Sequence, residues 1–435
     1  MISISYYKEN AEKIKDSIKK RNYNFPIEEL ESLIEKVGKR RKTLEELRHR
    51  QNKGSEEISK MKKEGKGDES KVKELAEIKA KIEELEKELK SDEERLDELL
   101  FNLPNFLHES VPVGVDERDN KEIYSWGEKK DKAIPPHDEI LESAGLLDAQ
   151  KAGEVAGSRF YYLKGDIALM ELALIRFAVD RILAKGYTLV TPPFMIRKKY
   201  FRGATSHMNF KESIYRVTEP GEAKDENFEH IEDELFLIGT AEHAIAAMHA
   251  NEVLNGSQLP IKYVGVSPCF RREAGSHGKD TKGIFRVHQF YKVEQFIFSN
   301  EKDSWSALEE LRKNGEELIK ELGIPYRVVI LSTGDISLVS AKTYDVEGYM
   351  PGQKRYRELQ SHSNCLDWQS RRLEIRYDEG GKRKYVHTLN GTALAVERTI
   401  VAIIENYCNE KGEIEVPKAL VPYMNGLEYI RPLKK

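Results

Sequence analysis

Three short segments of the sequence contain both arginine and acidic residues, together with residues that favour β-strands. They are FRREAGSHGKDTKGIFRVHQFYKVE (270–294), RYRELQSHSNCLD (355–367) and TLNGTALAVERT (388–399). A guanidinium group can hold a phosphate or a carboxylate through two parallel hydrogen bonds, which an ammonium group cannot do. If the segments meet in the fold, they predict a site for anionic reactants; each segment alone would predict only a salt-bridged surface.

The sequence lacks the other common signatures of nucleotide binding and hydrolysis. It contains no P-loop of the form GxxxxGK[ST], no HExxH, no GxSxG and no glycine-rich loop with the lysine strand of a kinase. It also lacks GxGxxG and the regular strand–helix alternation of a dinucleotide-binding sheet. The arginine-rich segments therefore need a different scaffold.

The part of the chain that carries these segments predicts an α+β domain. A helical pattern at DIALMELALIRFAVDRILAKG (166–186) stands among β-rich runs at 187–195, 261–270, 288–299, 326–332 and 371–379. Several of these runs follow one another and are bounded by glycine and proline. We expect a mixed, mainly antiparallel sheet flanked by helices, which follows a connector at residues 102–120.

Residues 27–100 have a different composition, because they contain no proline and no Phe, Tyr or Trp. Apolar residues recur there at steps of three and four, as in the seam of a coiled coil. In the second half these are Val72, Leu75, Ile78, Ile82, Leu85, Leu89, Leu96 and Leu99. The glycines of EGKGDES (64–70) interrupt the pattern, so we expect an antiparallel helical hairpin with limbs of about 54 Å.

The hairpin carries uneven charge. Residues 36–66 contain twelve Lys and Arg against five Glu, whereas the base of the return limb is acidic. A solvated coiled-coil surface with ordinary ion pairs is one explanation. A limb that faces phosphates is the other, because a protruding arm buries little apolar surface and contributes little to stability.

Composition narrows the class of protein. A length of 435 residues suggests two or three domains, and a formal net charge of −4 excludes a uniformly basic nucleic-acid coat. The three cysteines form no CxxC pair, which argues against a disulfide framework or a thiolate zinc site. The sequence has no apolar run of about 18 residues and no secretory signal pattern, so we expect a soluble, cytoplasmic protein with no membrane partner.

The three charged segments, taken with GYTLVTPP (186–193), resemble the motifs of the seryl-tRNA synthetase family. GYTLVTPP is similar to class II motif 1, with Pro193 as its signature proline; motif 2 lies near 266–294 and motif 3 near 388–401. The resemblance covers nearly the whole chain. It implies a tRNA-binding domain at 1–110, with its hairpin at about 27–100, and a class II catalytic domain at 111–435.

The resemblance also implies the site residues. Arg271, Arg398 and Glu358 would be catalytic, because fixed cations must separate two anionic reactants, a carboxylate and the α-phosphate of ATP. Glu273 would accept from the adenine amino group, on the same side of a strand as Arg271. Phe290 would stack on the adenine. The expected ATP-binding residues are Arg271, Glu273, Arg286, Val287, Phe290, Glu358, Ser361 and Arg398.

The remaining ligands follow from the same resemblance. Glu358 and Ser361 would hold Mg²⁺ with the phosphates. The expected serine-binding residues are Thr240, Glu242, Arg271, Glu294, Asn390 and Thr392, although Thr240 alone would predict an ordinary N-cap. On the hairpin, the candidates for tRNA contact are Lys39, Arg40, Arg41, Arg48 and Arg50.

The implied reaction is ATP-dependent formation of seryl-adenylate, followed by transfer of the seryl group to the 3′-terminal adenosine of tRNA(Ser), with tRNA(Sec) as a further candidate acceptor. The implied assembly is a homodimer, and no DNA partner is expected. The sequence departs from the family pattern at His277, His362 and Glu397, where small residues or Cys are usual. None of these three positions has an expected catalytic role.

Two rival interpretations share parts of this evidence. A related enzyme that activates an amino acid for a carrier protein would have the same body, but such relatives tend to lack a long hairpin. A non-enzymatic coiled-coil scaffold would have the hairpin, but it would have no use for Arg271, Glu273, Glu358 and Arg398 together.

Overall fold

The computed structural model describes residues 2–63, 65, 69–129, 131–206, 213–218, 234–273 and 282–433. His277 and nearly all of the acidic segment 219–234 lie outside these residues. The chain divides into two compact units, which we call the N-terminal unit (1–19 and 23–103) and the C-terminal unit (20–22 and 104–435).

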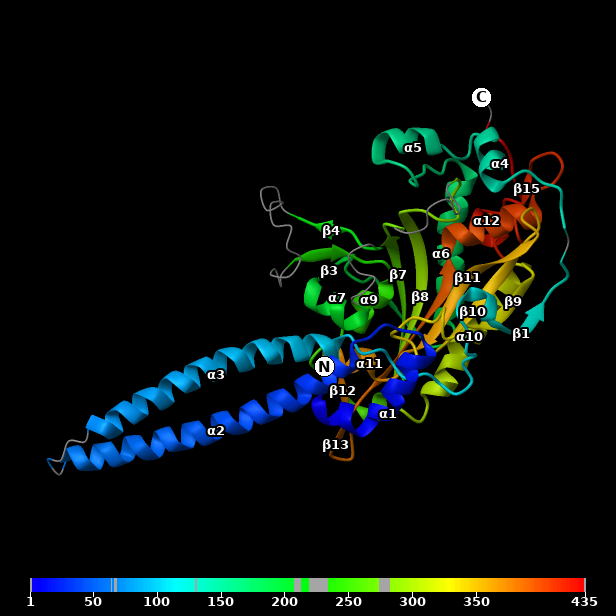
Figure 1. Cartoon of the computed structure of the whole chain (residues 1–435). Coiled ribbons are helices and arrows are strands. Elements are labelled where there is room, and N and C mark those ends of the chain that lie inside the picture. Colours follow the sequence, from blue (N-terminus) through cyan, green and yellow to red (C-terminus); the bar gives the residue numbers. More distant parts are fainter. Residues whose placement is uncertain are drawn as a thin grey trace. The chain divides into compact units, whose positions relative to one another are not determined.

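The N-terminal unit is helical. It contains α1 (Ile4–Lys20), α2 (Ile27–Lys63) and α3 (Glu69–Phe101). The last two helices lie side by side and form the long hairpin in Figure 1. Gly65, between them, has a φ of +75°, a backbone conformation that glycine adopts without the penalty of a Cβ. The predicted antiparallel hairpin is confirmed.

The hairpin is held by a seam of aliphatic residues. On α2 the seam buries Leu30, Ile34, Val37 and Leu44, and on α3 it buries Ile78, Ile82, Leu89, Leu96, Leu99 and Leu100. Val72 was expected in this seam but is 50% exposed. It lies in the first turn of α3, beside the reversal, where the seam meets solvent.

The C-terminal unit is built on a sheet of eight strands, in the order β1-β9-β10-β11-β14-β8-β7-β2. Neighbouring strands are antiparallel except β2 and β7, which are parallel. The mixed, mainly antiparallel sheet is thus confirmed. In sheet order, the strands span Lys121–Trp126, Tyr326–Ile330, Lys342–Met350, Arg355–Asn364, His387–Ala395, Gln289–Ser299, Ile261–Phe270 and Thr188–Val190.

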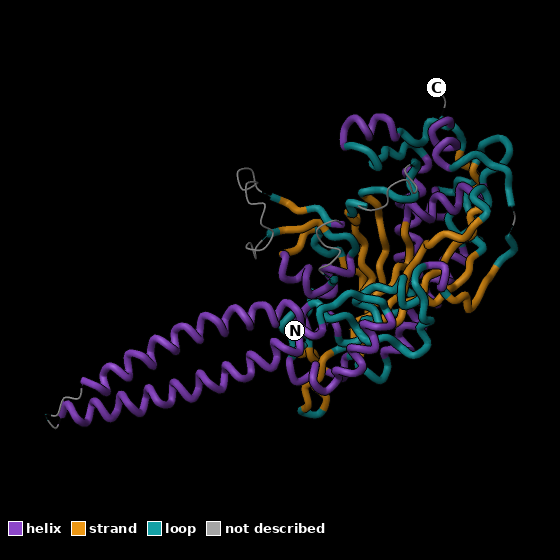
Figure 2. Tube along the Cα trace, in the orientation of Figure 1, coloured by secondary structure: helices purple, strands orange, loops and turns teal. Residues whose placement is uncertain are grey.

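Three long helices pack against this sheet (Figure 2): α6 (Asp166–Leu183), α10 (Ser304–Glu321) and α12 (Val396–Tyr407). On α6 the buried residues Ile167, Met170, Leu174 and Phe177 recur at three- and four-residue steps, which explains why this helix was predictable. The helices and strands share one hydrophobic core. Some of the side chains that line the cavity described below project from the strands of this sheet, and others come from adjoining helices and loops.

Shorter elements surround the sheet. Two expected strands differ from the structure: Pro192 and Pro193 separate β2 from β3 (Met195–Arg197), and 371–379 begins as the end of helix α11 (Trp368–Leu373) before strand β12 (Arg376–Glu379). Glu374 ends that helix in the left-handed conformation. The other short elements are α4 (His137–Ser143), α5 (Ala149–Ala156), α7 (Lys198–Ala204), α9 (Ala241–Ala246), β4 (Arg216–Val217), β5 (Leu235–Leu237), β6 (Val253–Asn255), β13 (Lys382–Tyr385), β15 (Ile414–Glu415) and β16 (Tyr429–Ile430).

None of the helices within the described residues is both long and apolar enough to cross a membrane.

Candidate active site

A cavity of about 290 Å³ lies in the C-terminal unit, lined by residues of β8, β11, β14 and α12 and of the segment that follows β7. It brings together side chains from segments that are far apart in the sequence. The expected ATP, serine and metal residues that line it are Thr240, Glu242, Arg271, Glu273, Arg286, Val287, Phe290, Glu294, Glu358, Ser361, Asn390, Thr392 and Arg398. All three charged segments therefore contribute to one cavity, and its guanidinium groups come from the first and the third of them.

Arg271 and Glu273 line the cavity, but they do not lie on a strand as expected. Strand β7 ends at Phe270, so both residues follow the strand, and Glu273 has a φ of +49°. Strand alternation therefore does not set the direction of Glu273, and that part of the prediction is wrong. The Arg271 guanidinium is fixed by a hydrogen bond from its Nε to the carbonyl oxygen of Gly239 at 3.2 Å.

Aromatic rings and acids hold the other guanidinium groups. Arg271 lies 5.2 Å from the ring centre of Phe290, and Arg398 lies 5.0 Å from that of Phe285. Arg286 donates to Glu273 at 2.8 Å. These stacked and paired cations leave a slot with aromatic and charged walls, which suits a purine base with a phosphate chain.

A β-bulge explains how Glu358 and Ser361 both line the cavity. Residues three apart on a regular strand face opposite sides of a sheet. Here Val346 pairs with Gln360 and Glu347 pairs with Glu358, so Leu359 is an extra residue in β11. The bulge changes the phase of the alternation between Glu358 and Ser361.

The oxygen donors at this point fit a magnesium ion bound together with phosphates. Asp345 lies opposite Ser361 across the β10–β11 ladder and accepts a hydrogen bond from its hydroxyl. One buried oxygen of Asp345, Oδ1, has no hydrogen-bond partner within the described part of the chain. Glu358 pairs with Arg398 at 3.1 Å, and this guanidinium lowers the pKa of the Glu358 carboxyl. Glu358, Ser361 and Asp345 thus offer hard oxygen atoms of the kind that magnesium binds.

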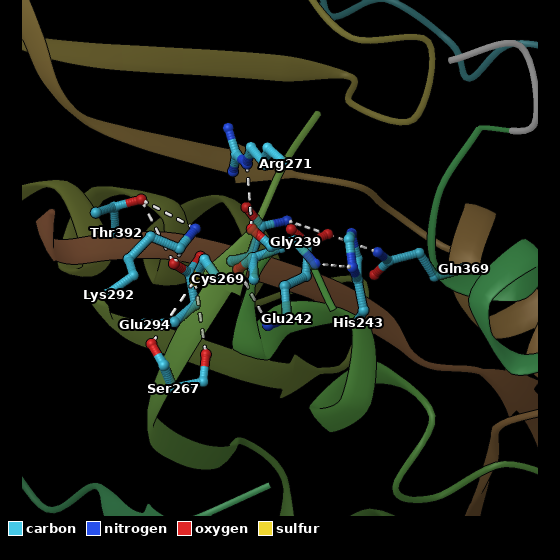
Figure 3. A network of polar contacts seen from close by, with 12 residues as sticks. Gly239, Glu242, His243, Ser267, Cys269, Arg271, Lys292, Glu294, Gln369 and Thr392 are labelled. Carbon is cyan, nitrogen blue, oxygen red and sulfur yellow. Dashed lines mark hydrogen bonds and ion pairs between the residues drawn. The ribbon is translucent and has the colours of Figure 1, made fainter. Parts of the chain in front are cut away.

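At the other end of the cavity the lining is buried and polar (Figure 3). Glu294 pairs with Lys292 at 2.5 Å, and both side chains are at least nine-tenths buried. Thr392 donates from its hydroxyl to Glu294 at 3.4 Å. Burial raises the pKa of Glu294, whereas the Lys292 ammonium opposes that shift.

Glu242 is the second buried carboxyl of this polar end. Its Oε1 accepts from Gln369 at 2.9 Å and from Asn390 at 3.0 Å. Burial, and then the negative charge of Glu294, raise the pKa of Glu242 to about 7. Thr240 accepts from the backbone N–H of Glu242 at 3.2 Å, so it is also the N-cap of α9.

Sequence reasoning missed several lining residues. On β8, Lys292 lies between Phe290 and Glu294, two residues from each. Residues two apart on a strand face the same side of the sheet, so the alternation indicated that Lys292 also lines the cavity. Phe285 and Cys365 also line the cavity. Gln369, on α11, carried no sequence signal, because only the tertiary fold brings that helix beside Glu242.

His362, one of the departures from the family pattern, is fully buried outside the cavity lining. A Cβ on Gly315 or Gly391 would lie within 3 Å of its ring, so two glycines make room for it. Burial lowers the pKa of His362 to about 3, so the imidazole is neutral. His362 is thus a packing residue of the sheet.

In the N-terminal unit, the candidate tRNA contacts are largely paired with acids of α3. Arg40 bonds Asp92 and Glu88 and its side chain is 20% exposed. Arg41 pairs with Glu93, Arg48 with Glu86 and Arg50 with Glu74. Lys39 is 81% exposed and meets only Glu35 of its own helix, at 3.8 Å, among the described residues.

Comparison with known families agrees with this geometry. A family model described as the seryl-tRNA synthetase N-terminal domain matches residues 1–107. A second, described as the tRNA synthetase class II core domain (G, H, P, S and T), matches residues 220–407. The serine–tRNA ligase of Pyrococcus horikoshii is 44% identical over all of this chain and 98% of its own length.

The chain belongs to the seryl-tRNA synthetase family. The serine–tRNA ligase of Nitrosopumilus maritimus is 43% identical over 99% of this chain and all of its own. This family membership confirms the resemblance seen in the motifs, and it makes the chain a class II aminoacyl-tRNA synthetase.

Two solved structures extend the comparison. The seryl-tRNA synthetase of Pyrococcus horikoshii complexed with ATP superposes with a TM-score of 0.88 at 44% identity, over the full length of both chains. The cytoplasmic serine–tRNA ligase of Naegleria fowleri in complex with AMP gives 0.83 at 33% identity, over 98% of this chain and 97% of the other. The class II fold expected from the motifs is confirmed.

Proposed function

We propose that this seryl-tRNA synthetase forms seryl-adenylate from serine and ATP, releases pyrophosphate, and transfers the seryl group to the 3′-terminal adenosine of tRNA(Ser). The observation that carries the proposal is the shared cavity, which joins an arginine-rich end to a buried polar end. The first end suits the phosphates and base of ATP, and the second suits a small polar amino acid.

In the first step a serine carboxylate attacks the α-phosphate of ATP, and the two anions repel each other. The charge of Arg271 acts both on Glu294 at the polar end and on Glu358 at the other, so this guanidinium would hold both anions. Arg398 would bind the γ-phosphate, while Phe290 stacks on the adenine. Glu273, Arg286 and Val287 would complete the ATP site, with Arg271, Arg398 and Glu358 as the catalytic residues.

Magnesium is the cation that the oxygen donors fit. Glu358 and Ser361 would hold it with the phosphates, where it would neutralise the charge of the departing pyrophosphate. Glu358 is held beside Arg398 at 3.1 Å, so the same carboxylate would also orient the arginine.

Serine selection would depend on buried hydrogen-bonding groups. Glu294 and Glu242 would accept from the ammonium and the hydroxyl, and Thr240, Asn390 and Thr392 would complete the pocket. A substrate without the hydroxyl would leave buried polar groups unpaired, which costs about 1–3 kcal/mol per group. Alanine would therefore be a poor substrate.

The second step requires tRNA, and we propose the N-terminal unit as its binding domain, with the boundary near residue 110. Its hairpin would contact the tRNA backbone and shape more than base edges. Among the candidates Lys39, Arg40, Arg41, Arg48 and Arg50, the exposure of Lys39 makes it the most accessible to a phosphate.

The wider biological setting is also part of the proposal. A homodimer would use motif 1, where Leu189 of β2 is apolar and exposed, together with the exposed Leu172 of the preceding helix α6. A cytoplasmic location is supported by three free, buried cysteines. tRNA(Sec) is proposed as a second acceptor because tRNA shape, more than base identity, would be recognised.

The test compares amino acids and acceptors. We expect ATP–pyrophosphate exchange with serine, at a rate at least about tenfold higher than with alanine. We also expect charging of tRNA with labelled serine. Exchange without tRNA charging would favour the carrier-protein enzyme, and the matched N-terminal domain argues against that outcome. Absence of both activities in the folded protein would leave only the scaffold interpretation.

A further inference from the structure

Glu397 is a buried acid that the reaction outlined above does not use. It is 1% exposed and directly precedes Arg398 at the start of α12. Both of its carboxyl oxygens accept from the backbone N–H of Tyr291 at 3.0 Å. Oε1 also accepts from the hydroxyl of Tyr161 at 2.5 Å. The side chain therefore points away from the phosphate partner that follows it, toward two other parts of the fold.

The end of the sheet ladder explains why an acceptor is needed here. Strands β14 and β8 pair as far as Ala395 and Lys292, and the chain then turns into α12 at Val396. Strand β14 can supply no backbone carbonyl beyond that point. The carboxyl of Glu397 takes the place of the missing acceptor for the N–H of Tyr291, which would otherwise be left without its partner.

The two residues joined by this contact flank the expected ATP site. Tyr291 directly follows Phe290, and Glu397 directly precedes Arg398. Both Phe290 and Arg398 line the cavity. A contact between Tyr291 and Glu397 thus links the backbone positions next to the two side chains that would enclose the base and phosphates of ATP.

Tyr161 extends the link to a third segment, residues 157–165. In that segment, the carbonyl oxygen of Arg159 accepts from the N–H of His288 at 3.1 Å, and the ring of Phe160 lies 5.4 Å from that of His288. His288 in turn contacts the carbonyl oxygen of Arg271 through Nδ1 at 2.7 Å. The segment is therefore attached both to the start of β8 and, through Glu397, to α12.

We propose that Glu397 is a positioning residue that fixes the spacing between Phe290 and Arg398 and so preforms the ATP site. The inference rests on the proposed function, because it needs ATP to bind between these side chains. Glu397 belongs to the cavity lining, but its carboxyl oxygens are held by Tyr161 and Tyr291, so we assign it a positioning role. Its effect is confined to the ATP half of the cavity, since Glu242 and Glu294 are held by other partners.

The protonation state of Glu397 agrees with this role. Burial raises the pKa of Glu397 to about 8, so near neutral pH the carboxyl mostly keeps its proton. It then adds little negative charge beside Arg398. A glutamine has the same shape, with one acceptor for the N–H of Tyr291 and one donor for Tyr161, and should replace it.

The test measures ATP and serine separately in the full-length protein. For Glu397→Ala we expect the KM for ATP in pyrophosphate exchange, and the Kd for ATP measured by calorimetry without magnesium, to rise about tenfold. The KM for serine should change less than about twofold. For Glu397→Gln, both ATP values should stay within about twofold of the wild type, and Tyr161→Phe should give an intermediate rise.

Glu405 provides a matched control on the same helix. It is 2% exposed and accepts from the backbone N–H of Gly352 at 3.0 Å, but it does not line the cavity. Glu405→Ala should lower the melting temperature without raising the KM for ATP. An equal rise in that KM for Glu405→Ala, or an equal rise in the KM for serine for Glu397→Ala, would overturn the proposal.

Three further outcomes are decisive. If Glu397→Ala does not fold, the test uses Tyr161→Phe. An unchanged Kd for ATP in Tyr161→Phe would overturn the proposal. A raised Kd for ATP in Tyr161→Phe, with no such rise in Glu397→Gln, would support it. If wild-type protein gives no serine-dependent exchange, the proposed function fails. If the wild type is active and Glu397→Ala binds ATP equally well, only the present inference fails.

Discussion

At the scale of single residues, the active site places ionisable groups where their charge depends on their neighbours. Glu294 has a buried ammonium group beside it, from Lys292, whereas Glu242 is bonded by neutral amides. The pKa of Glu242 is accordingly raised to about 7, first by burial and then by Glu294. The two carboxyls of one polar pocket therefore have different electrostatic surroundings.

The raised pKa of Glu242 predicts a pH dependence of serine binding. An ammonium group binds the ionised carboxylate better than the neutral acid, and Glu242 ionises as the pH rises through about 7. The KM for serine should fall about tenfold between about pH 6 and pH 8, as the ionised fraction increases. This is measured by pyrophosphate exchange at saturating ATP.

Glu242→Gln is the control for that profile. Its amide cannot ionise, so the KM for serine should be high at every pH and should no longer change between these limits. A wild-type KM that is independent of pH would contradict the assignment of Glu242 to the ammonium of serine.

Asp345 predicts a dependence on magnesium. It accepts from the hydroxyl of Ser361, and burial raises the pKa of its carboxyl. An amide in its place would weaken the contact with Ser361 and would offer one oxygen donor fewer beside the proposed ion. For Asp345→Asn we expect the magnesium concentration for half-maximal exchange to rise about 10- to 100-fold, as for other residues that orient metal ligands.

The Kd for ATP without magnesium separates this effect from a general defect. It should remain within about twofold of the wild-type value in Asp345→Asn, because Asp345 would act through the metal site. An unchanged magnesium requirement would show that Asp345 does not orient Ser361 for the ion.

At the scale of elements, the segments that are predicted best from the sequence are those in which apolar residues recur with a clear period. The α2–α3 hairpin and α6 carry clear helical patterns, and the first half of β7 carries strand-favouring residues such as Ile261, Tyr263 and Val264. The β-bulge at Leu359, the helix α11 and the contact of Gln369 with Glu242 depend on neighbours distant in the sequence. Nothing local predicts them.

The candidate site shows the same division. Arg271 and Glu358 were identified because their segments match family motifs, whereas Lys292 and Phe285 line the cavity without having been predicted. The direction of Glu273 was argued from strand alternation, but its positive φ lies beyond the end of β7. Motif resemblance thus located residues whose backbone geometry the sequence does not encode locally.

The hairpin offers a test at this scale. Leu96 is 2% exposed in the seam of α2 and α3, whereas Val72 is 50% exposed near the reversal. Leu96→Ala should lower the free energy of unfolding of the hairpin by about 2–4 kcal/mol, because it removes buried apolar atoms and leaves a cavity. Hydrogen exchange of α3 amides measures the loss.

Val72→Ala is the matched control, and it should change that free energy by less than about 0.5 kcal/mol. Both variants should keep serine-dependent pyrophosphate exchange, since the cavity lies in the C-terminal unit. Equal losses of protection in the two variants would contradict the burial pattern of the seam.

At the scale of the whole molecule, the fold serves to join residues that the sequence separates. Arg271 follows β7, Glu358 lies on β11 and Arg398 lies on α12, and the eight-stranded sheet brings all three to one cavity. The helical hairpin forms a unit of its own. We proposed above that the C-terminal unit activates the amino acid and that the N-terminal unit binds tRNA.

The most direct measurement of this account is serine-dependent ATP–pyrophosphate exchange by Arg271→Ala and by its neighbour variant Arg272→Ala. Arg271 lines the cavity and Arg272 does not. We predict that Arg271→Ala loses at least about 100-fold in exchange, as expected when a charge-stabilising donor is removed. Arg272→Ala should keep its rate within about threefold. Near-normal exchange by a folded Arg271→Ala, or an equal loss in both variants, would contradict the central claim.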